Sequence, residues 1–108
     1  MRAGPRRLSR PGKEFTAMHD SKRLREQRLL EAARQGDEQA FDELVRPLRD
    51  QIYWRAAKAV GDRDEAEDVT QETLLRAFTR LHTFRGDAAF SSWLYMVGTN
   101  CIRMHLRS

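Results

Sequence analysis

The side chains that could do chemistry are most concentrated in residues 62–72, where six carboxylates accompany one base, Arg63. The six are Asp62, Asp64, Glu65, Glu67, Asp68 and Glu72. Acids in the first turn of a helix are stabilised by the helix dipole, but that does not account for Asp68 and Glu72, which lie further in. The pattern predicts no pocket where an acid and a base converge, so we expect binding here and not catalysis.

A helix through these residues would separate two faces. The expected core face comprises Ala66, Val69, Thr70, Thr73, Leu74, Ala77, Phe78 and Leu81. The opposite face carries Asp68, Gln71 and Glu72 around an apolar residue, Leu75. A leucine ringed by carboxylates and an amide is typical of the centre of a small interface, so we interpret this face as a docking surface for a basic protein. The alternative is an ordinary solvated face.

A second group of candidate side chains begins where Arg85-Gly86-Asp87 breaks the helix. From residue 76 to residue 107 five arginines accompany a single acid. The outer face of the last helix should carry no acid and comprises Ser92, Met96, Thr99, Asn100, Arg103 and Arg107. Cations beside an aromatic-bearing loop are typical of a site for single-stranded nucleic acid. The cations would contact its phosphates, and the rings or a pocket would receive its bases. The alternative is that Phe90 and Trp93 belong to the core, which we expect for Trp93.

Catalytic, metal and cofactor sites find little support in the sequence. The histidines are dispersed, and Cys101 with His105 gives only two potential ligands at an i, i+4 spacing, too few for structural zinc. The glycines are isolated and form no phosphate-binding loop. We therefore expect no catalytic residue, no metal and no cofactor.

The candidate groups should lie on or between helices, and we predict an all-α, compact bundle of about four to five of them. The first should span about 21–35 and end at Gly36, and Asp37 should cap a second. Pro47 is expected to end that helix and to open a third segment, which ends at Gly61. A fourth should run from about Asp62 to Phe84, and a last, capped by Asp87, from about 88 to the end. Its expected core face is Phe90, Trp93, Leu94, Val97, Cys101 and Met104.

The N-terminal residues differ from the rest in composition. Residues 1–22 hold six basic and two acidic side chains, while the remaining 14 basic and 14 acidic residues cancel, so this stretch carries the net charge of +4. We predict a disordered basic tail over 1–21 and a folded domain over 22–108. The tail is either a basic arm for nucleic acid or a leader preceding a start at Met18, and we favour the leader. No apolar run predicts membrane insertion, and the single cysteine fits a reducing compartment.

The run EAEDVTQETLLRAFTRLHTFRGDAAFSSWLYMVGTN, residues 65–100, closely resembles domain 2 of bacterial extracytoplasmic-function (ECF) sigma factors. That family carries an ExEDxxQExxLRAF-like helix followed by FRGxxxFxxWLYxxxxN. The preceding stretch GDEQAFDELVRPLRDQIYWRAAKAVGD is similar to the family's earlier helices. The resemblance covers roughly residues 24–108, and the joint match is far more specific than any fragment of it.

The resemblance implies an all-helical domain of a transcription initiation factor, not an enzyme. In the family the acidic helix docks on the clamp helices of the largest subunit of core RNA polymerase. Asp68, Gln71 and Glu72 would make that contact here, with Leu75 at its centre. This is the face that the helical wheel had already separated from the core.

The resemblance also implies that the loop after this helix captures a flipped base from the non-template strand of the minus-ten promoter element. The last helix would lie along the upstream part of that element. The residues this assigns to DNA are Phe84, Arg85, Gly86, Asp87, Ala88, Ala89, Ser91, Ser92, Met96, Asn100 and Arg103.

This chain departs from the family pattern at three places. Met96 stands where relatives often have a basic side chain, and Ser91 and Ser92 replace a larger residue, which would alter contacts to DNA. The family continues into a helix-turn-helix domain for the minus-thirty-five element, whereas this chain stops at Ser108, so we expect a part of a longer protein.

Two other functions stay open at this point. One is a helical protein-interaction module held by an inhibitory anti-sigma factor, a partner that the resemblance makes probable in any case. The other is a generic helix-turn-helix module that binds duplex DNA. For the leading hypothesis we expect a cytoplasmic bacterial protein, associated with the nucleoid when active.

Overall fold

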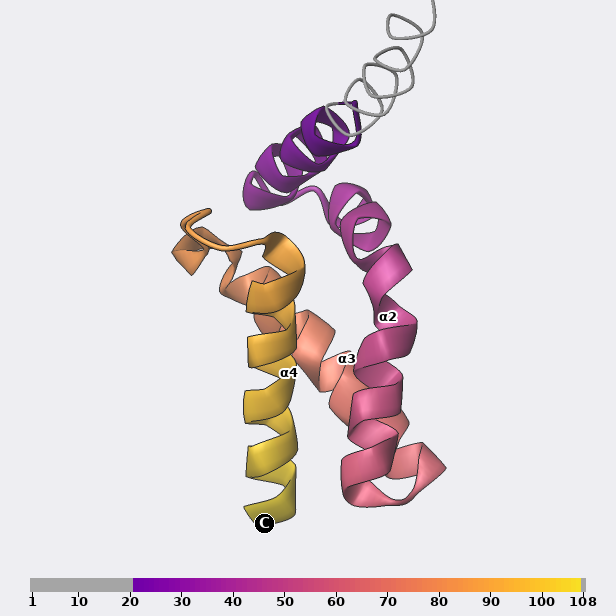
Figure 1. The fold of residues 1–108 in the computed structure, drawn as a ribbon. Coiled ribbons are helices and arrows are strands. Elements are labelled where there is room, and N and C mark those ends of the chain that lie inside the picture. The colour runs from indigo at the N-terminus through magenta and orange to yellow at the C-terminus, as the bar shows by residue number, and fades with distance from the viewer. Residues whose placement is uncertain (1–20, 108) are drawn as a thin grey trace, which may run out of the picture.

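The computed structural model describes residues 21–107, and all regular elements within that range are helices. An N-terminal helix covers residues 21–34 and is followed by α2 (Glu38–Val60), α3 (Arg63–Thr79), the short 3-10 turn η1 (Leu81–Thr83) and α4 (Phe90–Arg107). Each of α2, α3 and α4 contacts the other two, and α3 crosses diagonally relative to both (Figure 1). The predicted all-α bundle is thereby confirmed. The predicted tail lies outside the described residues except for residue 21, which is helical.

Local signals determine most of the helix ends. The side chain of Asp37 accepts a hydrogen bond from the Ala40 amide at 3.1 Å, and Asp62 caps α3 by accepting one from the Glu65 amide at 2.9 Å. Between these two caps, Gly61 ends α2 in the left-handed region, at φ 72°. A side chain at that φ is strained, which is why glycine suits the position. The predicted cap at Asp37 and the predicted end at Gly61 are confirmed.

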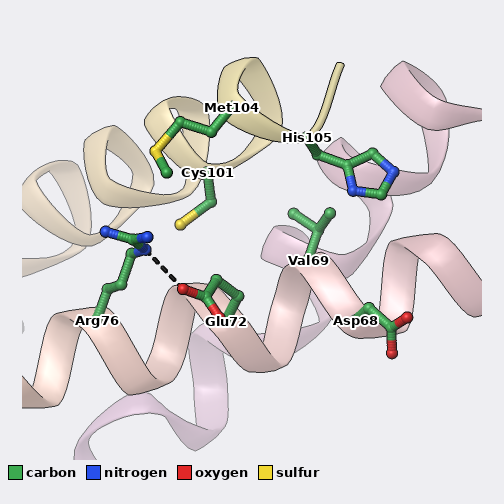
Figure 2. A pocket seen from close by; sticks show the side chains of 7 residues that line it. All are labelled: Asp68, Val69, Glu72, Arg76, Cys101, Met104 and His105. Carbon is green, nitrogen blue, oxygen red and sulfur yellow. Dashed lines mark hydrogen bonds and ion pairs between the residues drawn. The ribbon is translucent and has the colours of Figure 1, made fainter. Parts of the chain in front are cut away.

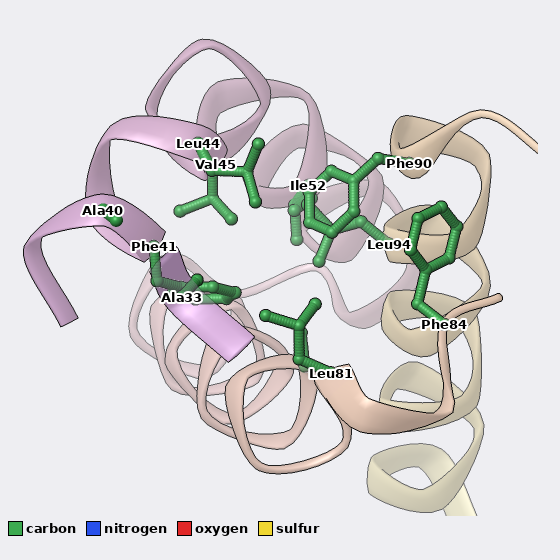
Figure 3. Close-up of a cluster of buried hydrophobic side chains, with 11 residues drawn as sticks. Ala33, Ala40, Phe41, Leu44, Val45, Ile52, Leu81, Phe84, Phe90 and Leu94 are labelled. Carbon is green, nitrogen blue, oxygen red and sulfur yellow. The ribbon is translucent and has the colours of Figure 1, made fainter. Parts of the chain in front are cut away.

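The main core joins the N-terminal helix to the other three helices. Its buried members are Ala33, Ala40, Phe41, Leu44, Val45, Ile52, Ala77, Leu81, Phe84, Phe90 and Leu94 (Figure 3). A smaller cluster of Ala56, Ala66, Val69 and Cys101 lies between α2, α3 and α4. The buried hydroxyls of Thr70 and Thr73 are satisfied, because each donates at 2.7 Å to the carbonyl four residues earlier.

The predicted break at Pro47 is wrong, because α2 continues through this residue as one helix of 23 residues. Proline cannot donate to the carbonyl of Glu43, and an interior proline costs a helix about 3 kcal/mol. The apolar face outweighs this cost, since Val45 before the proline and Ile52 after it are both buried. Burying one such side chain contributes about 2 kcal/mol. Two separate helices would have to give up part of that packing.

The fourth predicted helix is shorter than expected and ends at Thr79 instead of Phe84. The hydroxyl of Thr79 donates to the Arg76 carbonyl and that of Thr83 to the Arg80 carbonyl, so both compete with the helical ladder. The chain tightens into η1, where the Phe84 amide bonds the Leu81 carbonyl at 3.0 Å. This tighter turn brings the side chains of Leu81 and Phe84 into the core.

The last helix begins at Phe90, two residues later than predicted, and Asp87 does not cap it. The residue before the helix is Ala89, whose carbonyl accepts from the Trp93 amide at 3.2 Å. Met104 is also not a core residue, since it is 45% exposed near the free end of α4. None of the helices within residues 21–107 has the length and apolarity to cross a membrane.

Candidate functional site

The acidic face of α3, made of Asp68, Gln71, Glu72 and Leu75, is exposed as predicted. The first three are exposed polar residues, and Leu75 has 60% of its surface free. The core side of the same helix buries Ala66, Val69, Thr70, Thr73 and Ala77. The fold therefore leaves this acidic and partly apolar surface available for a partner.

The carboxylates on and near this face differ in whether a basic side chain of the protein pairs with them. Glu67 accepts from Arg49 of α2 at 2.7 Å and from the Gln71 amide at 3.4 Å. Glu72 accepts from Arg76, one turn later, at 2.7 Å. Asp68 has no ion pair or hydrogen bond from its side chain to any residue within 21–107. Of the carboxylates on the acidic face, Asp68 therefore has its charge least neutralised.

A groove between α3 and α4 lies beside the acidic face and has a volume of about 290 Å³. Cys101 and Met104 of α4 face Val69 and Glu72 of α3 across it (Figure 2). At its end His105 bonds Glu65 at 2.7 Å, which joins the last turn of α4 to the first turn of α3. Within residues 21–107 no cluster of histidine, cysteine and carboxylate side chains could hold a metal ion.

A second concavity, here called the loop pocket, lies at the other functional region and measures about 200 Å³. Its lining is Thr83, Phe84, Arg85, Gly86, Asp87, Ala88, Ser92, Trp93 and Met96. Seven of these are residues that the sequence assigned to DNA. Of the remaining predicted residues, Ala89, Ser91, Asn100 and Arg103 lie outside the pocket. Thr83 and Trp93 are lining residues that the prediction left out.

Aromatic rings form the inner wall of the loop pocket. The ring of Phe84 lies edge-to-face with Phe90 at 5.6 Å between centroids and tilted against Trp93 at 5.5 Å. Phe84 and Phe90 are buried, whereas Trp93 is half-buried and lines the pocket. Trp93 thus packs against the core, as we expected, and also presents part of its ring to the pocket. Phe84 lines the pocket but is only 6% exposed, so most of the accessible lining comes from its neighbours.

The outer face of α4 continues from the pocket along the helix. Met96 is 62% exposed at the pocket edge, and Asn100 and Arg103 follow it on the same face, exposed to solvent. Neither Arg85 nor Arg103 forms an ion pair with any of the described residues. The pocket and this face together present apolar and aromatic surface beside unpaired positive charge, which suits a single strand with a base turned out of its stack.

Arg34 is a residue of this region that the sequence reasoning missed. It belongs to the N-terminal helix, yet its guanidinium donates to the carbonyl of Phe84 and lies 5.9 Å from the centroid of that ring. The two residues are 50 positions apart, so no local pattern could have indicated the contact.

Comparison with known families gives a match that covers more than half of the chain. The family model described as sigma-70 region 2 matches residues 44–108. That range includes the acidic face, the loop pocket and the outer face of α4.

Comparison with individual proteins also gives RNA polymerase sigma factors. The chain is 41% identical over 81 residues to the RNA polymerase sigma-H factor of Pseudomonas aeruginosa, which covers 75% of this chain and 42% of that protein. It is 35% identical over 71 residues to the ECF RNA polymerase sigma factor SigW of Bacillus subtilis, covering 66% of this chain and 38% of that one. The chain thus spans less than half the length of these relatives.

A solved structure shares the fold. An engineered region 2 of sigmaE, determined by NMR in complex with GTAAAA, superposes with a TM-score of 0.68 at 31% sequence identity. The match covers 75% of this chain and 84% of that one.

Proposed function

Because the chain belongs to the sigma-70 region 2 family, and within it to the ECF sigma factors, we propose that it is a transcription initiation module that binds core RNA polymerase and recognises and melts the minus-ten promoter element. The proposed role is binding and not catalysis, so the module is not an enzyme. The same comparisons favour this role over a module that only binds protein.

The observation that carries the proposal is the loop pocket beside the acid-free outer face of α4. A flipped base needs a concave site with stacking surface, which Trp93 and Met96 provide at the pocket wall. The backbone of the strand needs cations, which Arg85 and Arg103 supply without competing internal ion pairs. Asn100 adds an amide that can both donate to and accept from a base edge. A related region 2 in complex with GTAAAA supports the choice of a short DNA strand as ligand.

The DNA-contact set that we propose is the predicted one, with the Phe84 ring as support. Arg85, Gly86, Asp87, Ala88, Ala89, Ser91 and Ser92 would form the base-capturing loop, and Met96, Asn100 and Arg103 the surface for the adjacent strand.

The acidic face is the proposed contact for polymerase, on its clamp helices. Asp68 supplies an unneutralised charge, Leu75 an exposed apolar centre, and Gln71 and Glu72 the polar surround. An interface of this kind gains association rate from charge complementarity and dissociation resistance from its apolar centre. A cytoplasmic, nucleoid-associated location and an anti-sigma factor that masks these surfaces follow from the same proposal.

A binding titration with labelled oligonucleotides tests the DNA part. Fluorescence anisotropy would compare a panel of single-stranded oligonucleotides of the non-template strand, differing base by base, with the corresponding duplexes. We expect a preferred single-stranded sequence, weaker binding to duplex, and about tenfold weaker binding for Asn100→Ala, as for loss of one base-edge contact. Asn100→Ala should still co-purify with core polymerase.

Two results would contradict the proposal. Equal affinity for all single strands would remove base capture, and stronger binding to duplex would favour a generic duplex-binding module.

A further inference from the structure

The base-capturing loop has few internal restraints. Residues 85–88 make no backbone–backbone hydrogen bond to any described residue, and Gly86 is at φ 87°. The loop is held mainly at its two ends. One end is Phe84, whose amide bonds Leu81, and the other is Ala89, whose carbonyl accepts from α4. The position of the loop therefore depends on what holds these ends.

Arg34 holds the first end from outside the loop. Its Nη2 donates to the Phe84 carbonyl, and its guanidinium lies over the face of the Phe84 ring, 5.9 Å from the centroid. The side chain keeps 31% of its surface exposed, so the contact is partly shielded from water. Hydrogen bonds from a charged donor are stronger than neutral ones, and the cation–π contact holds the ring as well as the carbonyl.

The ring that Arg34 holds also supports the pocket wall. Phe84 is 6% exposed and packs against Trp93, which lines the pocket. A shift of Phe84 would displace this wall and the start of the loop together. The N-terminal helix contributes no residue to the pocket. Besides the packing of Ala33 in the main core, it is connected to the pocket through the polar contact of Arg34 with Phe84.

We propose that Arg34 is a positioning residue for base capture, which sets the loop and the aromatic wall of the pocket without touching DNA itself. This inference rests on the proposed function. Lysine cannot replace it fully, because an ammonium is a point charge and lacks the planar fork of donors that reaches the carbonyl while the guanidinium lies over the ring. Loss of Arg34 should therefore lower both the affinity for the preferred strand and the preference for the captured base.

The test uses the full chain with Arg34→Ala, Arg34→Lys and a matched control, Arg25→Ala. Arg34 pairs with Glu31 at 3.9 Å, and Arg25, on the same helix but away from the loop, pairs with Glu43 at 3.1 Å. Each alanine variant therefore removes one arginine and one ion pair. Anisotropy would measure affinity for the preferred single strand and for strands with each other base at the captured position, well below the melting temperature of every variant.

A second measurement needs no DNA. The chain has two tryptophans, and in a Trp54→Phe background Trp93 alone reports on the pocket. Arg34→Ala should make Trp93 emission more accessible to acrylamide, while Arg25→Ala should not.

We expect Arg34→Ala to weaken the preferred complex about tenfold, near the lower end of what loss of a hydrogen bond to a charged group gives. The ratio between preferred and other bases should fall with it, Arg34→Lys should recover part of both, and Arg25→Ala should change neither. If Arg34→Ala only lowers the melting temperature and leaves affinity and base preference unchanged, Arg34 is a stability residue and the inference is wrong. If the unaltered chain shows no base preference, the proposed function is wrong. Quenching of Trp93 by acrylamide would then still show whether Arg34 positions the aromatic wall of the pocket.

Discussion

Arg49 of α2 and Glu67 of α3 form an ion pair beside the acidic face, with Nη2 2.7 Å from Oε2. Asp68 follows Glu67 in the sequence but has no partner among the described residues. Two adjacent carboxylates thus serve different ends, since one joins two helices and the other remains available to a partner protein. Substitutions at Glu67 and at Asp68 can therefore separate effects on the fold from effects on binding.

Glu67→Gln should destabilise the fold slightly and leave polymerase binding in place. The amide keeps the shape of the side chain but loses the charge that Arg49 pairs with, and both side chains are more than 40% exposed. Pairs this exposed contribute about 0.5 kcal/mol, so the free energy of unfolding in urea should fall by about that amount. A double-mutant cycle with Arg49→Met isolates the pair, and a coupling energy of zero would contradict its role.

Asp68→Arg should have the converse effect. Reversing an unpaired charge within a proposed interface introduces repulsion with a basic partner, so we expect affinity for core polymerase to fall by about tenfold or more. Pull-down with core enzyme and surface plasmon resonance would measure it, and the urea midpoint should stay close to that of the unaltered chain.

Asp50→Arg is the matched control, because Asp50 is also an exposed carboxylate but lies on α2. The assignment of the acidic face would be wrong if both substitutions weakened polymerase binding equally, or if neither did.

Leu75→Glu tests whether the apolar centre matters beside the charges. Leu75 is 60% exposed, so the substitution removes little core packing and should leave the melting temperature nearly unchanged. If the leucine is buried on docking, its loss should weaken polymerase binding about tenfold or more, as for a central interface residue. Leu24→Glu is the comparison, since Leu24 is 53% exposed on the N-terminal helix. Equal binding by both variants would show that the face acts through charge alone.

Met96→Arg should strengthen DNA binding. Met96 is 62% exposed at the edge of the loop pocket and lies on the acid-free face of α4, so an added cation there would reach the strand. One more phosphate contact on a single strand steepens the dependence of log affinity on log salt by about 0.7. Titrations at several salt concentrations would show this, with Leu106→Arg as a control for the added charge alone. An unchanged salt slope for Met96→Arg would place the strand elsewhere.

The parts of the fold that follow from local chemistry could be predicted from the sequence. Asp37, Gly61 and Asp62 define helix ends because each acts within one turn of its own position. The two faces of α3 followed from periodicity, and the family motif indicated the loop. Pro47 was misread because its local preference is outweighed by burial on either side of it, which only the tertiary structure determines.

The contacts that complete the candidate site could not be predicted in this way. Arg34 meets Phe84 across 50 positions, and the ion pair between Arg49 and Glu67 depends on how α2 and α3 cross. Periodicity also placed Met104 in the core, but it lines the open groove between α3 and α4 and is 45% exposed. A helical wheel gives the direction in which a side chain points, but not which residues of other helices it contacts.

Gly98 gives a prediction about stability in which two glycines of this chain should behave in opposite ways. It is buried in the middle of α4, and a methyl group added there would lie 3.5 Å from Thr73 Cγ2 and 3.8 Å from Ile52 Cγ2, which is ordinary contact. Glycine within a helix costs about 0.5–1 kcal/mol relative to alanine, so Gly98→Ala should raise the free energy of unfolding by about that much. The melting temperature should then rise by about 4 °C, as measured by circular dichroism.

Gly61→Ala provides the contrast, because Gly61 has open space around it but a φ of 72°. Alanine is strained in that region, so this variant should lose stability although nothing blocks the methyl group. A larger side chain at residue 98, as in Gly98→Leu, should also be destabilising, since it must displace Thr73 or Ile52. If Gly98→Ala were destabilising as well, α3 and α4 would have to pack more closely around residue 98 than these distances indicate.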